Sequence, residues 1–325
     1  MTEVQTARGP VDTSNLGRTL MHEHIFVLTP DVQQNHDEWD EQAQVTDAIA
    51  KLTELKQAGF DTIVDPTVIG LGRYIPRIEK LAAEVDLNII VATGVYTYDS
   101  VPFYFEHKGP GLGPELGFPE PMVDMFVRDI TQGIPGTGVR AAFLKCAIDH
   151  YGMTKDVERI LRAVAKAHRQ TGVPITVHTH PASKSGLEAH RVLKDEGVDP
   201  SRVVLGHSGD STDADHLSEL AGLGYLLGMD RFGIDVSSPF EDRVGIVAEL
   251  ASRGYADRMV LSQDAACYID WIDQTLKPQV LPNWHYLHIG NDVLPALKER
   301  GVTDDQIEQM LVGNPRRYFE NVGAY

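Results

Sequence analysis

The chain alternates between short runs of apolar, β-branched residues and longer segments with helical periodicity. In residues 46–59, 155–172 and 216–224, apolar side chains recur at intervals of three and four, and each segment ends at glycine, as helices often do. The short runs predict eight strands, at residues 19–26, 62–67, 88–96, 141–148, 174–180, 202–208, 224–232 and 258–265. Strands that alternate with helices indicate a parallel sheet.

Eight strand–helix units predict an α/β fold, a (β/α)8 TIM barrel. We expect a single domain over residues 1–325, with residues 1–16 as an N-terminal arm. An open, doubly wound sheet is the alternative, but no GxGxxG turn follows the first predicted strand to support it.

Two connections are much longer than the others. Residues 97–121 follow the third predicted strand, and residues 266–290 follow the eighth. Both fall on the face where barrel enzymes place their active sites, and loops of this length are usually functional or disordered. Their aromatic residues favour a lid over an apolar substrate.

Composition narrows the possible partners and the compartment. With 29 basic and 47 acidic residues the net charge is −18, which disfavours nucleic acid or an acidic membrane as a partner. No apolar run reaches the length of a membrane span, and the N-terminus lacks the apolar stretch of a signal peptide. Cys146 and Cys267 are too few for a disulfide framework, so we expect a reducing cytoplasm.

Two histidines stand two positions apart in the first predicted strand. Residues two apart on a strand share a face, so His22 and His24 are expected to project together and Glu23 to the other side. Neutral imidazole is the commonest metal ligand in proteins. A metal site is therefore one interpretation, and a buried histidine with a hydrogen-bonded neighbour is the other.

Further polar residues lie at or near the carboxyl ends of predicted strands: Lys145, His178, His207 and Asp264. The successive intervals from His24 are 121, 33, 29 and 57 residues, which places these groups on strands four, five, six and eight. Six candidate ligands are then expected to converge at one mouth of the barrel.

Lys145 is unusual because it lies inside an apolar strand, where burying a charged ammonium is costly. Its head could reach water, or it could form a Schiff base with a substrate. As a third possibility, a neutral amine could take up carbon dioxide as a carbamate and bridge two metal ions. The Schiff-base interpretation leaves the four histidines unexplained.

This ordered set of residues resembles the amidohydrolase superfamily. The chain is similar to the phosphotriesterase family, and most similar to its phosphotriesterase-like lactonases, from about residue 8 to residue 320. The sequence motifs that carry this resemblance are LGRTLMHEH, ATGVY, GVPITVHTH, LGHSGD and LGMDRFG. The resemblance implies two divalent metal ions, with zinc, cobalt, manganese or iron all suited to such ligands. His22, His24 and Asp264 would hold the more buried ion and His178 and His207 the more exposed one, with N6-carboxylated Lys145 and a hydroxide bridging both.

The same resemblance implies the hydrolysis of lactones, above all the N-acyl homoserine lactones whose loss is called quorum quenching. The hydroxide would attack, Asp264 would carry the proton, and Tyr96 and Arg231 would orient the lactone ring. A substrate pocket is expected from four apolar or aromatic residues: Tyr98, Trp271, Leu281 and Trp284. Relatives of this kind also imply a homodimer and a slow phosphotriesterase side activity.

Three alternatives remain at this point: an enzyme that acts primarily on phosphotriesters, a mononuclear deaminase of the same superfamily, and a non-catalytic binding barrel. Two departures from the lactonase pattern bear on substrate choice. A Gly-rich stretch at residues 108–117 looks inserted, and Ala265 and Ala266 stand beside Asp264 where bulkier residues can occur. The acyl-chain preference therefore cannot be carried over from the resemblance.

Overall fold

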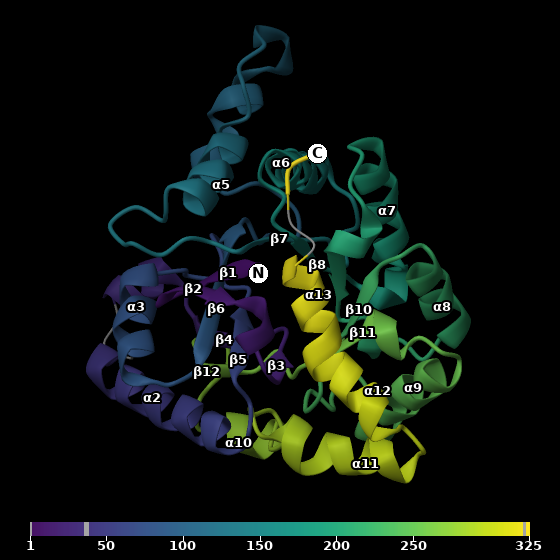
Figure 1. Ribbon diagram of the computed structural model, residues 1–325. Helices are drawn as coiled ribbons and strands as arrows, with labels where there is room; N and C mark the ends of the chain where they lie inside the picture. Colours follow the sequence, from purple (N-terminus) through teal and green to yellow (C-terminus); the bar gives the residue numbers. More distant parts are fainter. Residues whose placement is uncertain (1, 36–38, 321–322) are drawn as a thin grey trace.

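The computed structural model describes residues 2–35, 39–320 and 323–325, so residue 1 of the expected N-terminal arm lies outside it. One eight-stranded parallel sheet, in the order β11-β10-β9-β8-β7-β6-β5-β3, forms a nearly closed barrel (Figure 1). Its strands are β3 (Thr19–Leu20), β5 (Thr62–Asp65), β6 (Asn88–Gly94), β7 (Phe143–Ala147), β8 (Ile175–His178), β9 (Val203–Gly206), β10 (Leu226–Met229) and β11 (Met259–Leu261). The prediction of a TIM barrel is confirmed.

Helices surround the sheet and cover its outer face (Figure 1). They are α1 (Pro30–Asn35), α2 (Glu41–Gln57), α3 (Ile75–Glu84), α4 (Phe103–Glu106), α5 (Pro121–Thr131), α6 (Lys155–Thr171), α7 (Ser185–Asp195), α8 (Ala214–Gly222), α9 (Phe240–Ser252), α10 (Lys277–Val280), α11 (Leu294–Glu299), α12 (Asp304–Glu308) and α13 (Asn314–Glu320). The three helices predicted from periodicity are all present. Within the described ranges, no helix is long and apolar enough to cross a membrane.

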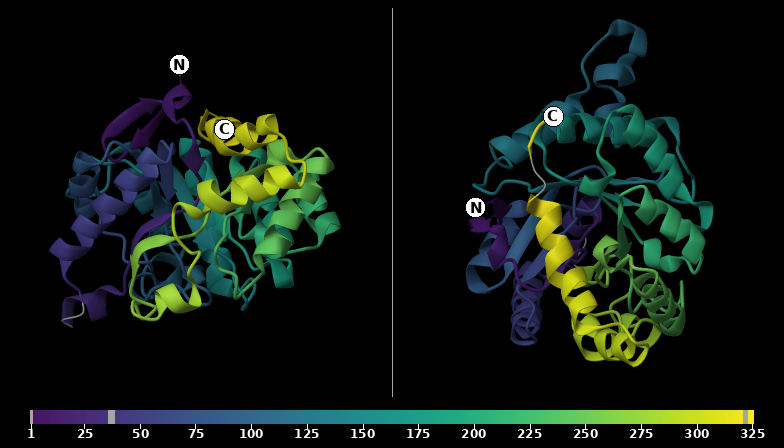
Figure 2. Two further views of the ribbon diagram at one scale, coloured as in Figure 1. Left: turned by 90° about the horizontal axis from the view of Figure 1, so that it is seen from below. Right: turned by 45° about the vertical axis from the view of Figure 1, so that its right-hand side comes forward.

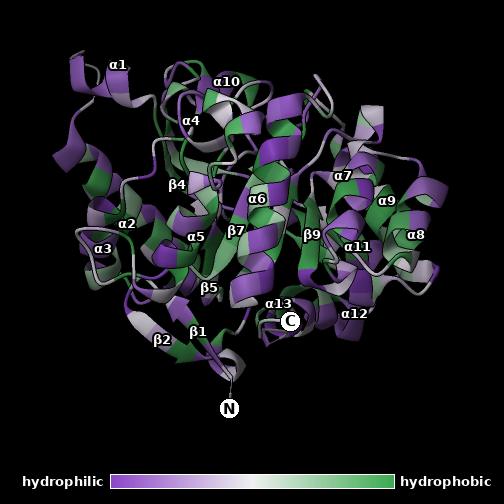
Figure 3. Ribbon diagram, turned by 90° about the horizontal axis from the view of Figure 1, so that it is seen from above, coloured by the Kyte–Doolittle hydropathy of each residue, from purple (hydrophilic) through white to green (hydrophobic). Residues whose placement is uncertain are grey.

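Helix α6 illustrates how local sequence sets these boundaries. The Thr154 side chain accepts a hydrogen bond from the Val157 amide and so caps the first turn. Gly172 ends the helix in the left-handed conformation, at φ 78°. In Figure 3 the strands β7 and β9 are mainly hydrophobic, and α6 in front of them presents both hydrophobic and hydrophilic residues.

The first barrel strand differs from the prediction. Residues 19–26 do not form one continuous strand: β3 ends at Leu20, and three residues separate it from β4 (His24–Val27). Strand β4 pairs in parallel with β12 (Ala266–Ile269), with Ala266 opposite His24. The connection over residues 266–290 therefore begins with a buried strand and not with a loop, because its apolar run finds a partner in the displaced half of the first strand.

The N-terminal residues form a hairpin of β1 (Glu3–Thr6) and β2 (Gly9–Asp12). The Ala7 amide donates to the Ile89 carbonyl at 2.8 Å, near the start of β6, so the hairpin packs at the amino-terminal end of the barrel strands. The boundary of this arm at residue 16 stays a prediction.

Part of the other long connection, residues 97–121, projects from the body of the barrel (Figures 1 and 2). Phe103 is 74% exposed, and Tyr104, Leu116 and Phe118 are also exposed. Most of this segment therefore does not cover the barrel mouth, contrary to the expected lid. Only its first residues, including Tyr98, reach the site described next.

Candidate metal centre

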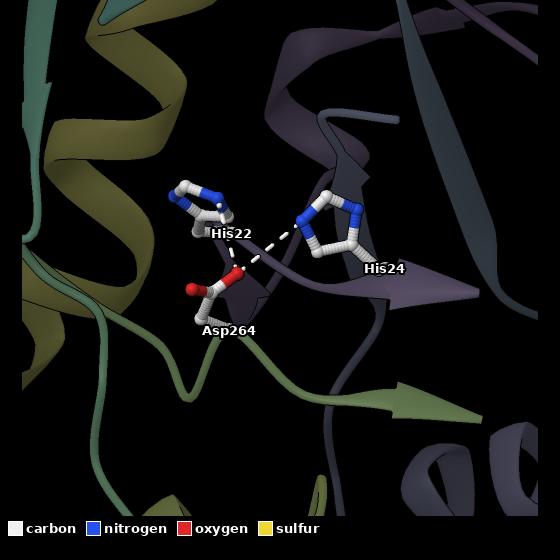
Figure 4. A group of neighbouring side chains, drawn as sticks. All are labelled: His22, His24 and Asp264. Atoms are coloured by element: carbon white, nitrogen blue, oxygen red, sulfur yellow. Dashed lines mark ion pairs between the residues drawn. The ribbon is translucent and has the colours of Figure 1, made fainter. Parts of the chain in front are cut away.

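His22, His24 and Asp264 meet at the carboxyl-terminal mouth of the barrel (Figure 4). Asp264 Oδ1 lies 3.3 Å from His22 Nε2 and 3.2 Å from His24 Nε2. One carboxylate and two imidazoles whose donor atoms converge in this way suit a divalent transition-metal ion. The prediction that the two histidines project together is thus confirmed, although a strand break precedes His24.

A second pair of imidazoles lies next to the first. His178, the last residue of β8, and His207, which follows β9, approach each other with Nδ1 of the former 2.8 Å from Nε2 of the latter. Burial lowers the pKa of the His178 ring to about 3 and also lowers the pKa of His207. Both rings are consequently neutral at pH 7, which is the form that binds metal ions.

Asp230, directly after β10, contacts two of these four histidines. Its Oδ2 lies 2.9 Å from His22 Nδ1, and its Oδ1 lies 2.9 Å from His207 Nδ1. His22, His207 and Asp230 also form a group whose donor atoms are close enough to hold an ion. Asp230 was not among the residues predicted from the sequence.

The other two histidines have orienting partners as well. His24 Nδ1 lies 2.7 Å from Thr67 Oγ1, and Thr67 in turn donates to Asp65. His178 Nε2 contacts the Asp149 carboxylate. Each imidazole therefore keeps one nitrogen on an orienting group and directs the other towards the centre, as metal-binding histidines characteristically do. Asp149 was missed too, although its position just after a barrel strand is the signal that identified the other candidates.

Lys145 lies on β7 and is 1% exposed. Burial lowers the pKa of its amine to about 8. Among the described residues its Nζ has no hydrogen-bond partner. A buried amine with unused hydrogen-bonding capacity, beside converging imidazoles, fits a site that holds a further charged group.

The segment that carries Asp264 is held by Glu23, which projects away from the metal-facing histidines as predicted. The Glu23 carboxylate accepts hydrogen bonds from the Ser262 hydroxyl at 2.7 Å and from the Gln263 and Ala265 amides at 2.7 and 2.8 Å. Asp264 itself has a left-handed backbone, at φ 55°, which is costly for a residue other than glycine. These three bonds offset that cost and fix the position of its carboxylate.

The two predicted substrate-orienting residues border the same centre. The Tyr96 hydroxyl lies 2.7 Å from the Tyr98 hydroxyl and 3.3 Å from His178 Nδ1. Arg231 Nε lies 3.2 Å from Asp264 Oδ2. Burial alone would raise the pKa of the Asp264 carboxyl, but the neighbouring histidines and Arg231 hold it well below its usual value. At pH 7 the carboxylate is ionised.

A cavity of about 180 Å³ opens beside these groups. Tyr98, Trp271 and Trp284 line it as predicted, and its remaining walls are largely apolar, from Val27, Leu71, Ile234, Ile269 and Ile272. Leu281, also predicted to line this pocket, does not. It lines a separate cavity of about 390 Å³, and Ala266 and Trp284 belong to the walls of both. Sequence position on the same loop could not distinguish the two cavities.

An eight-stranded parallel barrel with imidazoles and a carboxylate converging at the carboxyl ends of its strands has the architecture of a metal-dependent hydrolase. The chain belongs to the phosphotriesterase family, whose sequence model matches residues 2–319. It is 60% identical to the phosphotriesterase homology protein of Mycobacterium tuberculosis over the full length of both chains. It is 36% identical to an aryldialkylphosphatase of Saccharolobus solfataricus, over 95% of this chain and 96% of that protein.

Among solved structures, the chain is similar to the phosphotriesterase from Mycobacterium tuberculosis. That comparison has a TM-score of 0.97 at 60% identity and covers 99% of this chain and 100% of the other. Family membership and the two groups of histidine and aspartate ligands support a binuclear hydrolase.

Proposed function

We propose that the protein is a lactonase that hydrolyses N-acyl homoserine lactones at a binuclear metal centre, with slower hydrolysis of phosphotriesters. The observation that carries this proposal is the apolar cavity beside Asp264, with the Tyr96 hydroxyl and the Arg231 guanidinium at its polar end. A polar lactone ring that carries an apolar acyl tail matches that division of polar and apolar walls.

The residues that would hold the metal ions are those implied by the family resemblance. We propose His22, His24 and Asp264 for one ion and His178 and His207 for the other, with Lys145 as an N6-carboxylated bridge; the unpartnered, buried amine of Lys145 supports the last assignment. Bound divalent ions act as Lewis acids and lower the pKa of water from about 15.7 to about 7. Zinc is the proposed metal.

The chain's own residues would position the lactone and move one proton. The Arg231 guanidinium, fixed by Asp210 as well as Asp264, would donate hydrogen bonds to the ring ester. Tyr96, whose pKa is raised well above its ordinary value by burial, stays protonated and can donate its hydroxyl hydrogen. As water adds to the carbonyl carbon and the ring C–O bond breaks, Asp264 would carry the proton from the water to the alkoxide, which yields a hydroxy acid.

The acyl tail would extend from the lactone ring past Trp284. This side chain belongs to the walls of both cavities, and its Nε1 donates to the carbonyls of Gln263 and Asp264 at 3.0 and 3.1 Å, which fixes the indole in place. Beyond it, Leu281, Pro278 and Pro282 line the larger cavity. A tail of medium or greater length would bury its methylene groups there, each with a gain of about 0.8 kcal/mol.

An enzyme that acts primarily on phosphotriesters is the second candidate, and the similarity to the Saccharolobus solfataricus aryldialkylphosphatase favours it. The two can be distinguished with one panel of substrates assayed on the same metal-loaded preparation. We expect kcat/KM to be higher for N-acyl homoserine lactones than for a diethyl aryl phosphotriester such as paraoxon. A higher value for the triester would overturn the lactonase proposal. The homodimer and the cytoplasmic location stay predictions, and size-exclusion chromatography would test the former.

A further inference from the structure

Asp230 stands out because one side chain touches histidines proposed to bind different metal ions. Its Oδ2 lies 2.9 Å from His22 Nδ1. Its Oδ1 accepts a hydrogen bond from the His207 amide at 2.7 Å and lies 2.9 Å from His207 Nδ1. Asp230 is 1% exposed, so these contacts are made in the interior and without competition from bulk water.

Two glycines leave the space that this carboxylate occupies. A Cβ added at Gly228, on β10, would lie 2.4 Å from Asp230 Oδ2, and one added at Gly206, on β9, would lie 3.2 Å from the same atom. Two strands that lack side chains at these positions therefore accommodate a charged group between His22 and His207.

The contacts also determine which ring nitrogens are available. A carboxylate only accepts hydrogen bonds, so Asp230 favours the tautomers with hydrogen on Nδ1 of both histidines. Their Nε2 atoms are left with free lone pairs, and these are the atoms that face Asp264 and His178. Asp230 thus sets the tautomer and orientation of one histidine ligand at each proposed metal position.

We propose that Asp230 is a positioning residue that couples the two metal positions, so that losing this one carboxylate weakens the binding of both ions. The proposal rests on the binuclear centre set out under the proposed function. Asp149 provides the natural contrast, because it contacts only His178 among the four histidines. A single shared group should affect two ions, whereas a group with one histidine partner should affect one.

The experiment uses protein loaded with Co²⁺ and measures how fast cobalt is lost to excess EDTA, from the visible absorption of the bound cobalt and from elemental analysis of the retained metal. In Asp230→Asn the negative charge beside both rings is lost, and the amide nitrogen cannot accept a hydrogen bond from the ring that it faces. We expect both ions to be lost about 10–100-fold faster than from the wild type, the usual size of an outer-shell effect on metal affinity. In Asp149→Asn we expect faster loss of one ion only.

Asp129→Asn serves as the control for removing a buried carboxylate, because Asp129 is 1% exposed but bonds to Thr93 and Arg73, away from the histidines. Its cobalt loss should match the wild type. Should Asp230→Asn not fold, Gly228→Ala replaces it, since a Cβ there would lie 2.4 Å from Asp230 Oδ2 and must displace that carboxylate, while no proposed ligand is substituted. Faster loss of both ions supports the coupling.

If the variant at Asp230, or its replacement, releases only one ion faster or neither, the coupling is overturned while the binuclear centre stands. A wild-type protein that never retains two cobalt ions per chain would instead overturn the proposed function, and the coupling with it.

Discussion

Arg231 Nε lies 3.2 Å from Asp264 Oδ2, so the guanidinium proposed to orient the substrate is joined directly to a proposed metal ligand. Arg231 also reaches Asp210 at 3.1 Å. Its position is therefore set from two sides, and its remaining donors are available to the cavity.

Replacing Arg231 with lysine should impair turnover without removing the metal ions. Lysine keeps the charge but loses the planar set of donors. We expect kcat/KM for a hexanoyl homoserine lactone to fall about 10–100-fold, equivalent to roughly 1.4–2.7 kcal/mol of transition-state stabilisation. Arg253→Lys is the matched control, since Arg253 pairs with Asp215 and Glu249 on the surface. Equal activity of the two variants would remove Arg231 from the proposed mechanism.

Lys145→Met should abolish activity and yet stabilise the metal-free protein. The lowered pKa of Lys145, about 8, means that at pH 7 the folded chain bears the cost of a buried ammonium. Methionine has a similar length and no charge, so the free energy of unfolding should rise by on the order of 1–3 kcal/mol. Urea denaturation of the metal-free variant and wild type measures this difference in the free energy of unfolding.

The metal affinity and the activity of Lys145→Met should both fall by more than the roughly 10–100-fold expected when a group that only contacts a ligand is lost, since Lys145 is proposed as a direct ligand. Full activity with two ions per chain would show that Lys145 has no bridging role.

The metal-free protein should lose stability as the pH falls below about 6.5. Burial lowers the pKa of His22, His178 and His207, that of His178 to about 3. Between the folded and unfolded pKa values the unfolded chain binds more protons, so the free energy of unfolding decreases as pH decreases. Urea denaturation at pH 7.5, 6.0 and 5.0 measures the slope, which His178→Gln should reduce. The same slope in the wild type and in His178→Gln would contradict the assignment of a neutral His178 ring.

Leu281→Phe should discriminate between substrates by tail length. Leu281 lines the larger cavity and not the one beside the metal ligands, so a bulkier side chain should obstruct long tails only. We expect KM for a dodecanoyl homoserine lactone to rise about tenfold, equivalent to about 1.4 kcal/mol, with butanoyl homoserine lactone unaffected. Leu276→Phe on the same loop is the control, because Leu276 is 49% exposed and lines neither cavity. The same change in KM for both substrates would place the tail elsewhere.

Much of this centre could be predicted because a barrel brings the carboxyl ends of its strands to one face, so residues such as Lys145 and Asp264 could be grouped by strand end alone. The orienting groups could not be assigned in this way. Asp149 and Asp230 also follow barrel strands, but whether a carboxylate there binds a metal or a histidine depends on side-chain reach of a few ångströms. Spacing along the chain carries no such information.

The division of the first strand into β3 and β4 could not be predicted from periodicity either. Residues 19–26 are apolar enough for one strand, and the break after Leu20 arises because β4 finds a partner in β12, more than 230 residues away in the sequence. This pairing depends on tertiary structure, which the local sequence pattern does not determine.

The displaced half-strand has a consequence for the barrel as a whole. Among the described residues, the main sheet begins at β3 and finishes at β11 without a ladder between them. Single hydrogen bonds cross this gap, from the Met21 amide to the Leu261 carbonyl at 3.4 Å and from the Asp264 amide to the His22 carbonyl at 3.0 Å. The proposed cation-binding residues His22 and Asp264 stand immediately beyond this seam, one on each edge. An ion bound by both residues would add a link between the two edges of the barrel, so that metal binding for catalysis would also stabilise its closure.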